Sequence, residues 1–280
     1  MARRNYFELI QDMGFDADKE FEIISKLISE KIRLCPSISF RNVLNGNFLL
    51  YLKYRKIQFT SYDEVNEYFK NNMNGIERLF SYVEFIIDLY FFLKEKRLLD
   101  YNFSEHLILD KYNEIENRIS YSLDKTNHKL ITLDNGNRII VEKNVYASEV
   151  SQILSETNIQ EAIKVLEYNH FSNKGDIQRK KEILITLANY LEPLRKELNN
   201  SEELKEVFKV NNQKIIAFEK LFEMYNNFGL RHNNAKQYHL DMTNEKLEQW
   251  YDDIYTSSLF VILSLDEARI LSELTFLREE

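Results

Sequence analysis

Residues 75–93 read GIERLFSYVEFIIDLYFFL, and this stretch decides which kind of fold the chain adopts. Its apolar residues recur three and four positions apart, as they do on one face of a helix. Further apolar residues occupy much of the rest of the helix circumference. A helix that is apolar around most of its circumference is buried among other elements. We therefore predict a long helix at the centre of the first half of the chain.

Glycine and proline are scarce in the whole sequence. The 280 residues include six glycines and two prolines, whereas an average protein has about 12% of the two combined. Sheets, turns and long loops depend on these residues for unusual or fixed φ angles. The scarcity predicts a mainly α fold with short connections and excludes a β-sandwich, a propeller and a collagen-like chain. Neither of the common glycine-rich phosphate-binding motifs is present.

Caps and apolar periodicity predict the remaining helices. We expect helices from Asp16 or Asp18 to Leu34 with Pro36 ending it, from Ser61 past Phe69, from Phe103 to Leu123, from Ser148 to Glu156, over 159–169, from Asp176 with a kink or break at Pro193, after Ser201, from Lys214 to Phe228, and from Thr243 towards Leu277.

One segment departs from the helical pattern. Two β-branched runs, Lys129–Leu133 and Arg138–Glu142, flank Asp-Asn-Gly-Asn at 134–137. Asn-Gly between such runs is a strong hairpin signal, because both residues accept a positive φ. We predict one β-hairpin near residues 129–142, lying on a helical body. The expected organisation is a helical N-terminal domain, residues 1–144, that ends in this hairpin, and a helical bundle over residues 145–280.

The sequence offers little for a metal. Cys35 is the only cysteine, which excludes an intrachain disulfide and a cysteine-based zinc site. The histidines outside the segment discussed below stand alone: His106, His128 and His170. Glu84 and Asp88, four apart on the central helix, either bind a cation together or mark its exposed edge. We expect no metal and no cofactor.

The N-terminus lacks a continuous apolar stretch, and the most apolar run, residues 85–93, is too short to cross a bilayer. We therefore expect a cytoplasmic protein with no membrane contact. The net charge of −8 argues against bulk nucleic-acid binding, but it is uneven. Residues 170–236 hold 12 Lys and Arg against 9 Asp and Glu, within an otherwise acidic chain. This excess reflects either solvated scatter or a local anion site.

The segment 228–239 concentrates the chemistry. It contains Arg231, His232, Asn233, Asn234, Lys236 and His239 at a helix–helix junction. Arginine offers a planar, permanently charged fork for a phosphate, and histidine exchanges a proton near pH 7. Together they suit metal-free cleavage of an RNA phosphodiester by the adjacent 2′-hydroxyl. The alternative is a polar loop whose asparagines satisfy turn and cap groups.

Two stretches carry a resemblance to a known family. Residues 222–232, FEMYNNFGLRH, are similar to an amphipathic helix that ends in Gly-[Ile/Leu]-Arg-His, and the preceding helix contains LANYLEPLR at 187–195. Residues 145–280 thereby resemble the HEPN-type domain at the end of many bacterial abortive-infection (phage defence) proteins. The resemblance implies a helical bundle that dimerises. Many such domains are metal-independent ribonucleases that act as toxins, and others are inactive sensing or interaction modules.

The resemblance also nominates residues. It implies catalytic roles for Arg231 and His232, with His239 as a second candidate and Glu192 as a supporting carboxylate, and RNA contacts for Asn233, Asn234 and Lys236. The family usually places four to six residues between Arg and His. In this chain His232 directly follows Arg231, and seven residues separate Arg231 from His239. Two functions stay open: a dimeric endoribonuclease of a defence system, and a non-catalytic module that binds a phage-derived trigger or regulatory partner.

Overall fold

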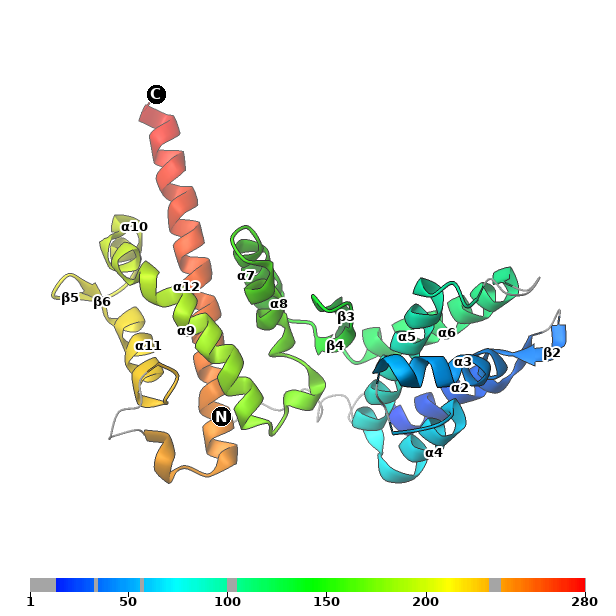
Figure 1. Cartoon of the computed structure of the whole chain (residues 1–280). Coiled ribbons are helices and arrows are strands. Elements are labelled where there is room, and N and C mark those ends of the chain that lie inside the picture. The colour runs from blue at the N-terminus through cyan, green and yellow to red at the C-terminus, as the bar shows by residue number, and fades with distance from the viewer. Residues whose placement is uncertain (1–13, 33–34, 56–57, 100–104, 232–237, 280) are drawn as a thin grey trace. The chain divides into compact units, whose positions relative to one another are not determined.

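The computed structural model describes residues 14–32, 35–55, 58–99, 105–231 and 238–279. These residues are mainly helical, which confirms the expected fold class. Contacts within the chain divide it into two compact units, residues 1–142 and 143–280, which we describe separately (Figure 1). None of the helices in the described ranges combines the length and apolarity that a membrane crossing needs.

The first unit is built around one buried helix, as its sequence predicts. Its helices are α2 (Ala17–Ser29), α3 (Phe40–Arg55), α4 (Tyr62–Asn72), α5 (Gly75–Glu95) and α6 (Glu105–Lys125). Ten side chains of α5 are buried, and α2, α3 and α4 pack against it. Burial on several sides explains why its apolar residues are not confined to one stripe.

The expected hairpin is present as an antiparallel pair, β3 (His128–Thr132) and β4 (Arg138–Glu142). Its turn differs from the expected one, in which Asn135 and Gly136 are the two central residues. Gly136 N donates to Leu133 O at 2.9 Å, which centres the turn on Asp134 and Asn135. Gly136 alone in this turn has a positive φ, of 81°. A turn of this kind followed by a left-handed glycine is the usual form of a longer hairpin loop.

The hairpin is fixed to α5 by one of the two carboxylates singled out in the sequence. Glu84 Oε1 accepts a hydrogen bond from Ile140 N at 2.6 Å. Asp88 instead accepts one from the Tyr51 hydroxyl at 2.6 Å and pairs with Arg55 at 2.5 Å. Each carboxylate therefore has its own protein partner.

Two further strand pairs contradict the prediction of a single hairpin. In the first unit, β1 (Lys31–Ile32) pairs with β2 (Cys35–Ser39), so α2 ends at Ser29 rather than near Leu34, and Pro36 lies in a strand. In the second unit, β5 (Val210–Asn211) pairs with β6 (Lys214–Ile215), where a helix was expected to begin. These strands are short, and the second pair has no glycine at its turn.

The second unit is a helical bundle in which α9 and α12 lie side by side (Figure 1). Its helices are α7 (Val145–Ser155), α8 (Ile159–Glu167), α9 (Ile177–Asn200), α10 (Glu202–Val207), α11 (Ile216–Asn227) and α12 (Asn244–Glu279), with the short 3₁₀ segments η1 (Phe171–Asn173) and η2 (Tyr238–Asp241). Asn144 caps α7, so this helix begins before the expected Ser148. Pro193 lies inside α9, which continues through it, so the expected break does not occur.

Two tyrosines fasten α8 to α12 in the core of this bundle. The rings of Tyr168 and Tyr255 are stacked with centroids 3.9 Å apart and planes 9° apart. The buried Tyr255 hydroxyl donates to Val165 O at 2.7 Å and accepts from Asn169 Nδ2 at 2.8 Å. This hydroxyl thus links Tyr255 on α12 to Val165 in α8 and to Asn169 just after α8.

Candidate functional site

Glu192 is placed by the packing of α9. The Asp176 side chain caps this helix by accepting from Arg179 N at 2.9 Å. The face formed by Ile183, Leu184, Leu187, Ala188 and Leu191 is buried in the core. Glu192 follows the last of these directly and lies at the edge of that face, with 29% of its side chain exposed. Its carboxylate is therefore held near the core without being fully desolvated.

Arg231 is placed by the way α11 ends. Gly229 has a φ of 66°, as expected for the residue after a helix cap. Leu230 N then donates to Tyr225 O at 3.0 Å, and Phe228 N donates to Met224 O at 2.9 Å. The Leu230 side chain is 2% exposed. This hydrogen-bonded stop, anchored by a buried leucine, fixes the direction in which the next residue leaves the helix.

The two elements bring Arg231 and Glu192 together. Arg231 Nη1 lies 2.6 Å from Glu192 Oε2, and 19% of the arginine side chain is exposed. Within the part of the chain that the structure describes, Oε2 has no aligned hydrogen bond, so the contact is an ion pair. Arg231 and Glu192 are the two candidate catalytic residues, of four, whose side chains the structure describes, and these side chains are in contact.

A second ion pair lies next to the first. Arg195 Nη1 is 3.8 Å from Glu192 Oε1, and its other nitrogens bind Glu219 on α11 at 2.5 and 3.0 Å. Hydrogen bonding to Arg195, with Asn199 and Lys214 adding to it, lowers the pKa of Glu219 to about 2. The four neighbouring charges thus alternate in sign across α9, α11 and the residues that follow α11: Arg231, Glu192, Arg195 and Glu219.

Sequence reasoning missed Arg195 and Glu219 as part of this network. Arg195 follows Glu192 by three positions on one helix, which is a recognisable signal for an ion pair. Glu219 offered no comparable signal, since it lies on the separate helix α11 and only tertiary packing brings it close. The network matters for the site because Glu192 is shared between two arginines.

The rest of the predicted site lies beyond what the structure describes. His232, Asn233, Asn234 and Lys236 are outside the described residues. His239 belongs to η2, but its side chain is also outside them. The roles assigned to these residues therefore remain predictions.

About half of the cations of residues 170–236 are paired with carboxylates. Among the described residues of this segment, six Lys and Arg side chains form ion pairs: Arg179, Lys180, Arg195, Lys205, Lys214 and Arg231. The Lys180 ammonium lies 2.7 Å from a carboxylate oxygen of both Glu248 and Asp252. Carboxylates from outside the segment, Glu167, Glu248 and Asp252, therefore offset part of its excess positive charge.

Of the three described histidines outside the loop, His106 is exposed, and His128 and His170 contact neighbouring residues. His128 is buried, and its Nδ1 lies 2.6 Å from Thr126 O. His170 caps η1 by accepting from Ser172 N at 3.3 Å. Within the described ranges, no three His, Cys, Asp or Glu side chains gather as a metal site requires.

Comparison with known proteins adds no relative. No protein-family model, no curated protein and no solved structure matches this chain.

Proposed function

We propose that residues 145–280 form a HEPN-like bundle and that the chain is a metal-independent endoribonuclease of a phage-defence system, acting as a dimer. The contact between Arg231 and Glu192 carries the proposal. It supports the proposal because the arginine nominated for the reaction is oriented by a carboxylate from the neighbouring helix, which is the supporting role given to Glu192.

Arg231 stabilises the transition state in this mechanism. Cleavage begins when the 2′-hydroxyl oxygen attacks the adjacent phosphorus, which places extra negative charge on the phosphate oxygens. A guanidinium carries five N–H donors in a planar fork. The pairing with Glu192 uses Nη1, and in the proposed mechanism the other guanidinium donors bind the phosphate. Fixed donors aimed at developing charge account for a large part of many enzymatic accelerations.

Histidine moves the protons. His232 or His239 removes the proton of the 2′-hydroxyl, and a protonated histidine returns one to the leaving 5′-oxygen as the bond between phosphorus and that oxygen breaks. The products are a 2′,3′-cyclic phosphate and a 5′-hydroxyl. Asn233, Asn234 and Lys236 contact the RNA around the cleaved bond in this scheme.

A second function is supported by the burial of Arg231. With 19% of its side chain exposed and its charge paired, this arginine resembles a structural residue. In that alternative the bundle is a non-catalytic interaction module, and the Glu192 pair fastens the end of α11 to α9. The two functions differ in what happens to RNA when Arg231 is removed.

Induced expression of the wild type, Arg231→Ala and His232→Ala in bacteria, followed by growth curves and total-RNA gels, tests the proposal. The wild type is expected to arrest growth and fragment RNA, and both variants to leave them intact. Arg269→Ala is the matched control, since Arg269 forms an exposed ion pair with Glu197 at 2.7 Å and takes no part in the proposed reaction. Equal growth and equally intact RNA in all four strains contradict ribonuclease activity.

A further inference from the structure

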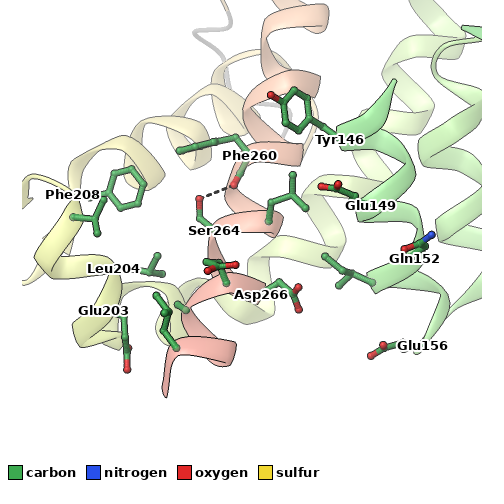
Figure 2. A pocket seen from close by; sticks show the side chains of 16 residues that line it. Tyr146, Glu149, Gln152, Glu156, Glu203, Leu204, Phe208, Phe260, Ser264 and Asp266 are labelled. Atoms are coloured by element: carbon green, nitrogen blue, oxygen red, sulfur yellow. Dashed lines mark hydrogen bonds between the residues drawn. The ribbon is translucent and has the colours of Figure 1, made fainter. Parts of the chain in front are cut away.

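A wide groove opens on the second unit, between α7, α10 and α12. Its volume is about 840 Å³. Figure 2 shows Tyr146, Glu149 and Gln152 on α7 facing side chains of α10 and α12 across the opening. Arg231 and Glu192, the candidate catalytic residues whose side chains are described, do not line it. The groove is thus a separate feature of the same bundle.

The groove collects apolar side chains that the chain itself leaves uncovered. Four of its lining residues are large and exposed: Tyr146 at 63%, Val207 at 76%, Phe260 at 50% and Leu271 at 43%. Isolated apolar residues on a surface are ordinary, but several around one concave site mark an interaction surface. Ile153 and Phe208 extend this apolar lining on α7 and after α10.

The charge around these apolar residues has a single sign. The described lining includes five carboxylates, Glu149, Glu156, Glu203, Asp266 and Glu267, and no described Lys, Arg or His. Arg269 interacts electrostatically with Asp266, but among the described residues no cation forms an ion pair with Glu149, Glu156 or Glu267. An apolar groove with a predominantly acidic rim complements a ligand that is apolar on one side and positively charged on the other.

The length of the groove favours a helix as that ligand. On α12 the lining residues Phe260, Leu263, Glu267 and Leu271 are three or four positions apart and so share one face. From Phe260 to Leu271 that face runs for about 16 Å, or roughly three helical turns. A groove of this length takes the apolar stripe of an amphipathic helix, with its anchors three and four residues apart.

We infer that the groove between α7, α10 and α12 binds a cationic amphipathic helix of a partner protein. Its apolar stripe packs on Phe208, Phe260 and Leu271, and its Lys or Arg residues meet the carboxylates of the rim. Nucleic acid and anionic membranes are repelled by the same rim. The inference does not depend on ribonuclease activity, and loss of that activity in Arg231 variants leaves it unaffected.

Binding of a designed peptide to the purified full chain tests the inference. The probe is a fluorescein-labelled helix of about 18 residues, with leucines at positions i, i+3, i+4 and i+7 and lysines elsewhere. A peptide with the same leucines and with glutamates in place of the lysines is its counterpart. Fluorescence anisotropy is expected to show saturable binding of the lysine peptide, weakened by added salt, and none of the glutamate peptide.

Two pairs of variants separate the groove from general attraction. Glu149→Lys with Glu267→Lys is expected to weaken binding by roughly tenfold or more. The control pair Glu116→Lys with Glu223→Lys changes the net charge equally at two exposed residues that are not part of the groove lining. Val207→Ser with Phe260→Ser is expected to abolish binding, whereas Ile159→Ser, at a residue 58% exposed and outside the groove, leaves it unchanged.

Other outcomes overturn the inference. If the control pair weakens binding as much as the groove variants do, overall charge rather than the groove causes the attraction. If the lysine and glutamate peptides both bind, apolarity alone causes it. A chain that is dimeric in light scattering and becomes monomeric with Val207→Ser and Phe260→Ser has a second copy in the groove instead of a partner's helix.

Discussion

The guanidinium of Arg231 lies 2.6 Å from the carboxylate of Glu192, and hydrophobic packing rather than the ion pair brings them there. Leu191, the neighbour of Glu192, and Leu230, the neighbour of Arg231, are both buried in the core. The partly exposed pair adds little to the free energy of unfolding, on the order of 1 kcal/mol or less. Function and stability should therefore respond very differently to changes in this pair.

Glu192→Gln is the first test of that separation. The amide keeps the shape of the side chain but removes the charge that orients Arg231. We expect RNA cleavage to fall by about tenfold or more, while the melting temperature shifts by no more than a few degrees. Cleavage assays on purified protein, with thermal melts of the same samples, measure both.

The charge-swapped pair, Glu192→Arg with Arg231→Glu, completes the comparison. It is expected to be more stable than either single variant, because the attraction is restored with its direction reversed. It is expected to remain inactive, because the residue that follows α11 at position 231 no longer carries the positive charge. Recovery of activity in the swapped protein contradicts the role proposed for Arg231.

Glu219 predicts how stability depends on pH. Its pKa is lowered to about 2 in the folded protein, chiefly by Arg195, from an ordinary value of 4.5. The unfolded chain therefore takes up a proton first as the pH falls. The stabilisation by Glu219 is complete above about pH 5 and is lost between there and about pH 2. The difference in unfolding free energy between the wild type and Glu219→Gln should shrink over this window; a constant difference contradicts the assignment.

Tyr255→Phe tests the fastening of α8 to α12. The change keeps the ring but leaves Val165 O and the Asn169 side chain without the hydroxyl that they contact. Unsatisfied buried polar groups cost about 1–3 kcal/mol, so chemical denaturation should reveal a loss of that size. Tyr146→Phe is the control, because Tyr146 is 63% exposed; an equal loss in both variants rejects the explanation.

Gln213→Gly is expected to stabilise the second unit. Asn212 and Gln213 have φ angles of 49° and 63°, which form the turn between β5 and β6. Glutamine pays a steric cost of about 1 kcal/mol in this region, which glycine avoids. The larger flexibility of glycine in the unfolded chain offsets part of the gain. Denaturation should show a net gain of about 0.5 kcal/mol; a loss instead shows that the glutamine side chain makes a stabilising contact.

Local chemistry explains which parts of the fold were predictable. Asp176 and Gly229 mark helix ends through short-range hydrogen bonding and φ preference, and the structure confirms both. The turn at Asn212 and Gln213 was missed because glutamine rarely adopts a positive φ. Pro193 suggested a break, but packing of α9 on both sides of it holds the helix together.

The candidate site was predictable to a smaller extent. The sequence resemblance nominated Arg231 and Glu192, and the structure places them in contact. The spacing of Glu192 and Arg195 on α9 was a signal for their ion pair. Nothing in the sequence indicated that Glu219 on α11 binds that arginine, because this contact depends on how the two helices pack. The apolar groove was not foreseen either, since its walls come from α7, α10 and α12.

Cleavage of a labelled RNA oligonucleotide by the purified chain in the presence of EDTA tests the central claim most directly. The account predicts fragments ending in a 2′,3′-cyclic phosphate with the wild type, none with Arg231→Ala, and none from an oligonucleotide whose riboses are all 2′-deoxy. Fragments that Arg231→Ala produces at the wild-type rate, or cleavage of the deoxy oligonucleotide, would contradict it.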